Sequence, residues 1–223
     1  MIDLDFWRKV TSDFISKGVT LVAVSKTKPV EDILALYNAG QRDFGENYVQ
    51  ELVEKQTILP SDIRWHFIGH LQGNKVKYIA PFVSLIHAID SYKLLVEINK
   101  YAQKNNRIID VLLQIFIADE ETKFGLDEPE IIELLDSYRK DIEDMKHIRI
   151  CGLMGMATNS SDERKIQGEF ARLHNFFQKI ADSYFQGVSY FSVCSMGMSA
   201  DYEIAIKEGS NMVRIGSLLF GSR

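Results

Sequence analysis

The stretch 19-VTLVAVSKTKP-29 begins with aliphatic residues and turns abruptly polar at Ser25. Such a run is typical of a strand buried on both faces, as the strands of parallel sheets are. Runs of the same character recur along the chain at 42–46, 63–69, 84–90, 109–117, 149–157, 190–196 and 211–220. Together they predict eight strands.

Most of the segments between these runs have the period of a helix. Residues 30–37 place apolar side chains at i, i+3, i+4 and i+7, and Gly40 follows as a C-terminal cap. Two pairs, Asp127 with Glu130 and Ser160 with Glu163, have the spacing of a capping box. Further helices are expected over 3–18, after an N-cap at Ser91, and from 199 to 207.

Strands that alternate with helices define an α/β fold. We expect a single (β/α)8 barrel of the TIM type over residues 1–223, with 1–18 as an extra N-terminal helix packed on the barrel. An open doubly wound sheet is the alternative. It is less favoured because the first strand leads into 25-SKTKP-29, where a dinucleotide-binding sheet carries G-x-G-x-x-G.

The composition argues against several classes of protein. The 223 residues are 46% hydrophobic with a formal net charge of −5, unlike a general nucleic-acid binder. The two cysteines, Cys151 and Cys194, fit a reducing compartment and cannot build a disulfide framework. Because no apolar run is long enough to cross a bilayer and no signal peptide is evident, we expect a cytoplasmic protein without a membrane partner.

The first strand is followed by two lysines. In a barrel the site lies at the C-terminal ends of the strands, which is where Lys26 falls. Desolvation favours the neutral amine, and a neutral amine attacks an aldehyde to form a Schiff base. Lys28 is either a second lysine of the site or part of its rim. The alternative is that the strand stops early and both lysines are solvated loop residues.

The last two strands are followed by small residues. Ser195 opens 195-SMGMS-199, and Gly216 and Ser217 follow the eighth strand. Backbone N–H groups, hydroxyls and a helix N-terminus near Ser199 would suit a phosphate, which barrels often bind at this place. The alternative is that the glycines serve only as turn residues.

Other polar residues have more than one interpretation. Arg214, inside the eighth strand, points either inward to a ligand or outward to a helix carboxylate. His66 is a satisfied core residue or part of the pocket, and its spacing from His70 does not favour a metal site. Asn47 follows the second strand, while Met154 ends the sixth and is expected to pack. An amine facing a phosphate cradle suits a phosphorylated aldehyde such as pyridoxal 5′-phosphate (PLP), or the substrate of a class I aldolase.

Several motifs in the right order resemble those of the YggS/PROSC family of PLP homeostasis proteins. They are 22-VAVSKTKP-29, 44-FGENYVQE-51, 65-WHFIGHLQGNK-75, 122-TKFG-125, 152-GLMGMA-157, 195-SMGMSADYEIAI-206 and 213-VRIGSLLFG-221. The family fold is similar to the N-terminal barrel of alanine racemase, a fold-type III PLP arrangement.

The resemblance implies roles for individual residues. Lys26 would hold PLP as a Schiff base, with Lys28 a possible secondary acceptor. Ser195, Gly216 and Ser217 match phosphate positions; the family more often has Thr where Ser217 stands, which keeps a hydroxyl. Arg214 matches the residue near the pyridine nitrogen, and ring-lining positions match Asn47, His66 and Met154.

The resemblance also implies a function. A cationic Arg214 would oppose protonation of the pyridine nitrogen and make the ring a poorer electron sink. The sequence ends at Arg223, soon after the last strand, so we expect no racemase second domain, and no second base unless a barrel tyrosine replaces it. The expectation is a monomeric PLP carrier without robust catalysis, with PLP-dependent or PLP-synthesis and salvage enzymes as partners. The alternative is a small amino-acid racemase or related PLP enzyme.

Overall fold

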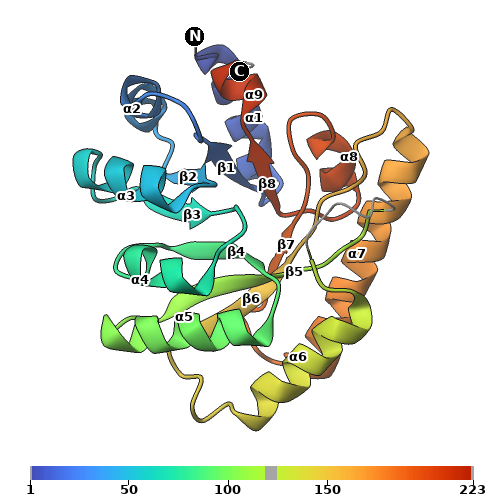
Figure 1. The fold of residues 1–223 in the computed structure, drawn as a ribbon. Coiled ribbons are helices and arrows are strands. Elements are labelled where there is room, and N and C mark those ends of the chain that lie inside the picture. The colour runs from blue at the N-terminus through green and yellow to red at the C-terminus, as the bar shows by residue number, and fades with distance from the viewer. Residues whose placement is uncertain (1, 119–124, 222–223) are drawn as a thin grey trace.

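The computed structural model describes residues 2–118 and 125–221, which form a closed barrel of eight parallel strands in sequence order (Figure 1). The strands are β1 (Thr20–Val24), β2 (Asp43–Glu46), β3 (Arg64–Phe67), β4 (Leu85–Ile89), β5 (Ile109–Gln114), β6 (Ile148–Met154), β7 (Val193–Ser195) and β8 (Met212–Ile215). Ala23 pairs with Phe44 on one side and with Ile215 on the other, so β1 closes the barrel. The predicted barrel is confirmed, and the alternative prediction of an open sheet is wrong.

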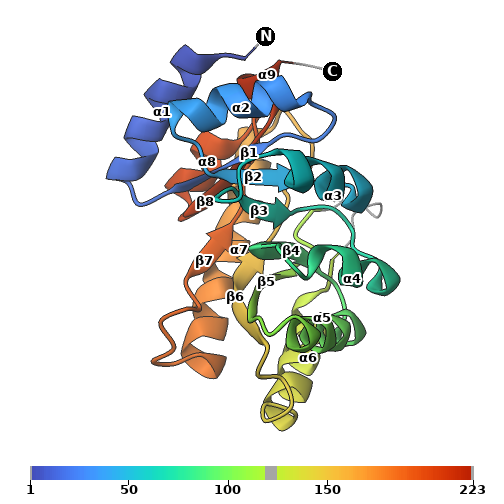
Figure 2. The ribbon, with the colours of Figure 1, turned by 90° about the vertical axis from the view of Figure 1, so that its left-hand side faces the viewer.

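Helices surround the barrel on its outer side (Figures 1 and 2). They are α1 (Leu4–Ser16), α2 (Val30–Ala39), α3 (Val49–Ile58), the 3-10 turn η1 (Gly73–Lys75), α4 (Val76–Ile79), α5 (Tyr92–Lys104), α6 (Glu128–Lys140), α7 (Glu163–Tyr184), α8 (Tyr202–Lys207) and α9 (Ser217–Phe220). In the described part of the chain, no helix is both long and apolar enough to span a membrane.

The helix caps follow the sequence signals with one exception. Gly40 takes the left-handed conformation at φ 118°, Ser91 accepts from the backbone of Leu94, and Asp127 forms the predicted capping box. The expected box at Ser160 is wrong. Asp162 caps α7 instead, because its carboxylate accepts from two N–H groups of the first turn, whereas the Ser160 hydroxyl accepts from the N–H of Asp162.

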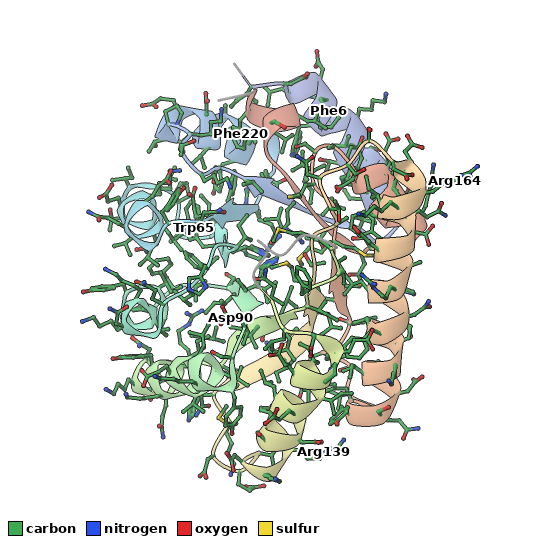
Figure 3. All side chains as sticks on the ribbon, turned by 45° about the vertical axis from the view of Figure 1, so that its right-hand side comes forward. Phe6, Trp65, Asp90, Arg139, Arg164 and Phe220 are labelled. Atoms are coloured by element: carbon green, nitrogen blue, oxygen red, sulfur yellow. The ribbon has the colours of Figure 1, made fainter. Side chains whose placement is uncertain are left out.

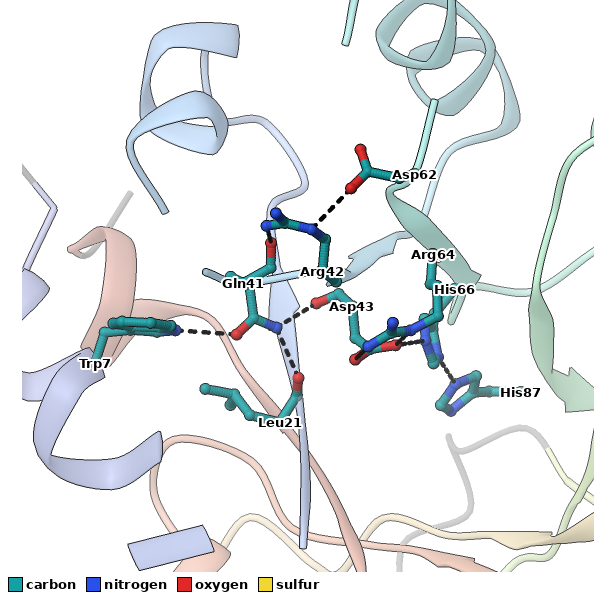
Figure 4. A network of polar contacts seen from close by, with 9 residues as sticks. All are labelled: Trp7, Leu21, Gln41, Arg42, Asp43, Asp62, Arg64, His66 and His87. Atoms are coloured by element: carbon teal, nitrogen blue, oxygen red, sulfur yellow. Dashed lines mark hydrogen bonds and ion pairs between the residues drawn. The ribbon is translucent and has the colours of Figure 1, made fainter. Parts of the chain in front are cut away.

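The expected N-terminal helix is α1, and it packs against the barrel through Trp7. The indole of Trp7 donates to the side chain of Gln41 over 2.9 Å, and the Gln41 amide donates to the carbonyls of Leu21 and Asp43 (Figure 4). Just before α1, the N–H of Asp3 donates to the carbonyl of Leu219, which lies near the C-terminal end of the chain. The first helix is therefore tied to strands β1 and β2 and to α9.

The buried side chains form two apolar clusters. The larger one lies between strands and helices and includes Trp65, whereas charged residues such as Arg139 and Arg164 are exposed on α6 and α7 (Figure 3). The smaller cluster fills the barrel interior and consists of Val22, Leu85, Ala88, Leu112, Cys151, Met154 and Met212. The interior is therefore a packed core, on which any site must rest.

Several strands end earlier than their apolar runs. The run 211–220 divides into β8 and the short helix α9, because the chain turns at Gly216. Strand β7 is three residues long and ends at Ser195, and β5 ends at Gln114. The early end of β8 places Gly216 directly after the strand and Ser217 at the start of α9.

Candidate functional site

Lys26 lies in a tight turn directly after β1. Ser25 continues the strand pairing, since its N–H donates to the carbonyl of Gly45, and the N–H of Lys28 then folds back onto the carbonyl of Ser25. Thr27 adopts a left-handed conformation with φ 62°, which is uncommon for a β-branched residue. The strand therefore stops at the position that the sequence indicates, with half-buried Lys26 at the mouth of the barrel.

A buried ion pair supports this turn from behind. Lys55, on α3, places its ammonium 2.8 Å from Glu46 Oε1 and 2.6 Å from Glu51 Oε1, and also donates to the carbonyl of Ser25. Glu46 accepts from the Ser25 hydroxyl over 2.6 Å, and Glu51 accepts from the N–H of Thr27 over 2.6 Å. Burial raises the pKa of Glu46, although Lys55 opposes the rise. The residues on both sides of Lys26 are thus held by charge-assisted hydrogen bonds.

Lys28 has a different environment from Lys26. Its ammonium donates to the carbonyls of Phe220 and Gly221, at 3.2 and 3.1 Å. Cations are favourable at the last carbonyls of a helix, and these carbonyls end α9. Lys28 therefore ties the turn after β1 to the C-terminal helix.

Arg214 points into the barrel. Its guanidinium donates to the hydroxyl of Ser195 over 2.7 Å and to the carbonyl of Gly155 over 3.0 Å, and the residue is 4% exposed. Burial lowers the pKa of Arg214 to about 10, so the group stays cationic at neutral pH. The alternative of an outward salt bridge is wrong. Because Ser195 accepts from Arg214, its own proton is directed elsewhere.

The ends of β8 and β1 approach each other closely at Gly216. A Cβ added to Gly216 would lie 3.3 Å from both Cβ and the carbonyl oxygen of Val24. The N–H of Gly216 donates to the hydroxyl of Ser199 over 3.3 Å, and exposed Ser217 begins α9. The expected helix start near Ser199 is wrong, because residues 199–201 form a turn and α8 begins at Tyr202.

Asn47 and Met154 approach the barrel mouth from other strands. Asn47 follows β2, and its Oδ1 is buried without a hydrogen-bond partner among the described residues. Met154 ends β6 and packs in the interior cluster with 1% of its surface exposed. A buried acceptor without a partner costs free energy unless a ligand or water supplies the donor.

His66 and His70 do not face each other. His66 lies inside the barrel, where its ring nitrogens contact His87 at 2.9 Å and Asp43 at 3.0 Å (Figure 4). His70 lies outside and pairs with Asp90 at 3.1 Å. Within the described ranges, there is no group of three or more His, Cys, Asp or Glu residues that could hold a metal ion.

The structure thus brings most of the predicted site residues to one end of the barrel. Residues 122–124 of the motif 122-TKFG-125 lie outside the described residues. Sequence reasoning missed His87 and Lys55. The Glu51–Lys55 spacing of i, i+4 is a signal for the second, whereas His87 is a single polar residue in an apolar run.

The closed eight-stranded parallel barrel with surrounding helices is the fold class of the N-terminal domain of alanine racemase. The model of that family, alanine racemase N-terminal domain, matches residues 7–223. The chain belongs to this family and, within it, to the YggS/PROSC group of pyridoxal phosphate homeostasis proteins, as the relatives below establish.

The similarity extends over nearly the whole chain. The pyridoxal phosphate homeostasis protein of Aquifex aeolicus is 41% identical over 204 residues, which cover 91% of this chain and 86% of the relative. That of Schizosaccharomyces pombe is 40% identical over 210 residues, covering 93% and 85%. PipY of Synechococcus elongatus has been solved without PLP (TM-score 0.83, 34% identity, 92% and 93% covered) and with PLP bound (TM-score 0.79, 33% identity, 92% and 93% covered).

Proposed function

We propose that this protein binds PLP at the C-terminal end of the barrel and maintains the intracellular PLP supply by buffering or delivering the cofactor. The observation that carries the proposal is the position of Lys26 just beyond β1, a strand that ends beside Gly216 and pairs with β8, which carries the inward Arg214. Residues 1–223 would act as one PLP-binding domain, with 1–18 packed on the barrel. The names of the relatives, and the PLP-bound form of PipY, support this function.

Lys26 is the residue that would hold PLP covalently. Its neutral amine would condense with the aldehyde, forming a carbon–nitrogen double bond while the carbonyl oxygen leaves as water with both amine protons. The turn of Lys26 is supported by Ser25, Glu46 and Lys55 rather than by mobile surface groups. A rigid attachment point favours retention of the cofactor because little ordering is needed on binding.

The remaining predicted residues fit the rest of PLP. Ser195 at the end of β7, Gly216 after β8 and Ser217 at the start of α9 would offer hydroxyl and backbone donors for the phosphate. Asn47 has a buried acceptor that lacks a protein donor among the described residues. Met154 would line the ring through its apolar surface, and His66, whose ring nitrogens are both engaged, would do so through its carbon edge.

Arg214 favours a carrier over a catalyst. A buried guanidinium near the pyridine nitrogen would oppose protonation of that nitrogen, and an unprotonated ring stabilises a carbanion poorly. The competing function is an amino-acid racemase or related PLP enzyme, which the similarity to the alanine racemase N-terminal domain supports. The two are separated by exchange of the Cα proton of alanine in deuterated water, which an enzyme would accelerate well above free PLP.

The first test is an absorbance spectrum after incubation with PLP and desalting. We expect a yellow Schiff-base band in the parent protein and in Lys28→Ala, and its loss in Lys26→Ala. A band that survives in Lys26→Ala, or its absence from the parent, contradicts the proposal. Turnover of alanine that depends on Lys26 would instead favour the enzyme.

The proposal also covers the cellular compartment and the protein partners. We infer a monomeric cytoplasmic protein whose PLP-loaded form docks on PLP-dependent enzymes or on enzymes of PLP synthesis and salvage. Pull-downs with the PLP-loaded parent and with Lys26→Ala compare the two states directly. If both pull-downs recover the same proteins at background level, docking is contradicted and buffering is left as the function.

A further inference from the structure

The segment 155–158, which follows β6, contacts the candidate site at its first residue. The N–H of Gly155 donates to the carbonyl of Ser195 over 3.1 Å, which extends the pairing of β6 with β7 by one residue. The carbonyl of Gly155 accepts from the guanidinium of Arg214 over 3.0 Å, and the same guanidinium donates to the Ser195 hydroxyl over 2.7 Å. Gly155 therefore supplies an acceptor that holds Arg214 in its inward position.

The last residue of the segment is bound to α7, a long helix on the outer side of the barrel (Figure 1). Both carboxyl oxygens of Glu169 accept from Thr158. Oε2 accepts from its N–H and Oε1 from its hydroxyl, each over 2.6 Å. Thr158 is 8% exposed and Glu169 is 5% exposed, and hydrogen bonds shielded from water are electrostatically stronger than exposed ones. The pair is thus a firm link between the segment and α7.

A second contact from the same face of α7 lies at the start of the segment. Leu173 follows Glu169 by four residues, a spacing that places both side chains on one face of a helix. A Cβ added to Gly155 would lie 2.9 Å from Cδ2 of Leu173, so the backbone of the segment comes very close to the helix. The segment is therefore held by α7 at both of its ends.

Glu169 is a polar residue on a face of α7 that is otherwise apolar. The buried neighbours on this part of the helix are Ile166, Phe170 and Leu173. A buried carboxyl group costs free energy even when it is hydrogen-bonded, and an apolar side chain of similar volume often serves stability as well or better. Stability alone does not account for Glu169, whereas the place of Thr158 does.

We propose that Glu169 is a positioning residue for Arg214. By binding Thr158 it fixes the segment 155–158, so that the carbonyl of Gly155 keeps the guanidinium beside Ser195. Glu169 acts through the segment and does not touch Arg214 itself. The link to Arg214 is independent of the proposed function, whereas its effect on PLP binding rests on that function.

The link is tested on the protein without ligand, by NMR measurement of hydrogen exchange. Glu169→Leu removes both acceptors of Thr158, and we expect faster exchange of the Thr158 N–H and of the guanidinium N–H groups of Arg214. If the Arg214 signals exchange in Glu169→Leu as they do in the parent, the proposal is overturned.

Asn99→Leu is the matched control for this variant. Asn99 on α5 is 8% exposed, donates to the carbonyl of Asp144 over 2.8 Å and accepts from the N–H of His147 over 3.0 Å. It thus binds the loop before β6, at the opposite end of the strand from the segment. Asn99→Leu should weaken the fold but leave the exchange of Arg214 unchanged. An equal effect of both variants on Arg214 would show general destabilisation and overturn the proposal.

The consequence for the cofactor is tested with PLP in absorbance titrations. We expect affinity to fall about tenfold in Glu169→Leu, the equivalent of about one hydrogen bond, and about threefold in Thr158→Val, which loses only the hydroxyl bond. Thr158→Ser keeps both donors and should bind PLP as the parent does, and so should Asn99→Leu.

The outcomes separate this inference from the proposed function. Unchanged affinity in Glu169→Leu, or a loss in Thr158→Ser as large as in Thr158→Val, overturns the positioning role in PLP binding. Failure of the parent to bind PLP would instead contradict the proposed function, and the hydrogen exchange of Arg214 would still decide whether Glu169 positions it.

Discussion

Glu46 and Lys55 form an ion pair of 2.8 Å whose side chains are 0% and 7% exposed. The pair joins the end of β2 to the middle of α3, and both residues also bind Ser25, which precedes Lys26. A buried pair of this kind contributes little net stability compared with apolar residues, but removal of one partner leaves an uncompensated charge. Its position indicates that it serves to hold the turn of Lys26.

Lys55→Met should therefore destabilise the fold strongly. We expect a loss of about 3–5 kcal/mol, measured by urea denaturation, because Glu46 is left buried without its counter-ion. The pKa of Glu46 is already raised by burial, and the variant should raise it further. Glu46 then ionises at a lower pH in the unfolded chain than in the folded one. The variant should therefore lose stability as the pH rises above the pKa of an ordinary carboxyl group.

The double variant Lys55→Met with Glu46→Leu is the control for this prediction. Replacement of both partners by apolar residues removes the orphaned charge, so most of the lost stability should return. If the double variant is as unstable as Lys55→Met, the loss comes from packing around α3 and not from the buried charge.

Asp43 should contribute to the acid stability of the barrel. Its folded pKa of about 2 lies below the ordinary value of 3.8, so the folded state binds fewer protons than the unfolded state in this interval. The stabilisation is present above about pH 4 and is lost as the pH falls toward 2, and amounts to about 2 kcal/mol. Asp43→Asn should flatten the unfolding free energy over this interval in urea titrations. An acid transition that is unchanged in Asp43→Asn would contradict this assignment.

The order of strands and most of the helix caps were predictable from the sequence. Apolar runs mark strands that are buried on both faces, and local signals such as Gly40 and Asp127 act within a few residues. The ends of the runs were less accurate, because an apolar segment such as 211–220 does not show where β8 stops and α9 begins. The places of Lys26 and Asn47 just after strands were predictable for the same reason, while their roles in binding PLP stay a prediction.

The supporting contacts were not predictable, because they depend on how neighbouring strands are aligned. His66 pairs in register with Leu85, which places His87 two residues further along β4, within reach of the ring of His66. A lysine on a helix, such as Lys55, is expected to be exposed, and the packing of α3 against β2 buries it. Pairings of this kind form at long sequence separation and leave no local pattern.

Lys28 should stabilise α9 and take no covalent role. Lys28→Met removes two hydrogen bonds to the carbonyls of Phe220 and Gly221, and we expect a loss of about 1–3 kcal/mol with faster hydrogen exchange in α9. The PLP band should remain, since Lys26 is intact. Lys17→Met is a matched control, because its ion pair with Asp13 is half exposed and contributes at most about 1 kcal/mol. Equal effects of the two variants would contradict a specific bond from Lys28 to α9.

Gly216→Ala should weaken PLP binding more than it weakens the fold. Gly216 has φ −121°, which any residue adopts, so the backbone imposes no strain. The added Cβ would instead lie 3.3 Å from Val24, where the ends of β8 and β1 meet, and would push the loop after β8, which we propose binds the phosphate, outward. We expect PLP affinity to fall about tenfold, a change of about 1.4 kcal/mol, in absorbance titrations.

Gly168→Ala provides the comparison for this last prediction. Nothing lies within 4 Å of a Cβ added to Gly168, which is exposed in the middle of α7. Alanine is the better helix former, so this variant should gain up to about 1 kcal/mol of stability and bind PLP as the parent does. If Gly216→Ala also binds PLP as the parent does, then the loop after β8 does not contact the phosphate, and the site must be placed nearer to Ser195.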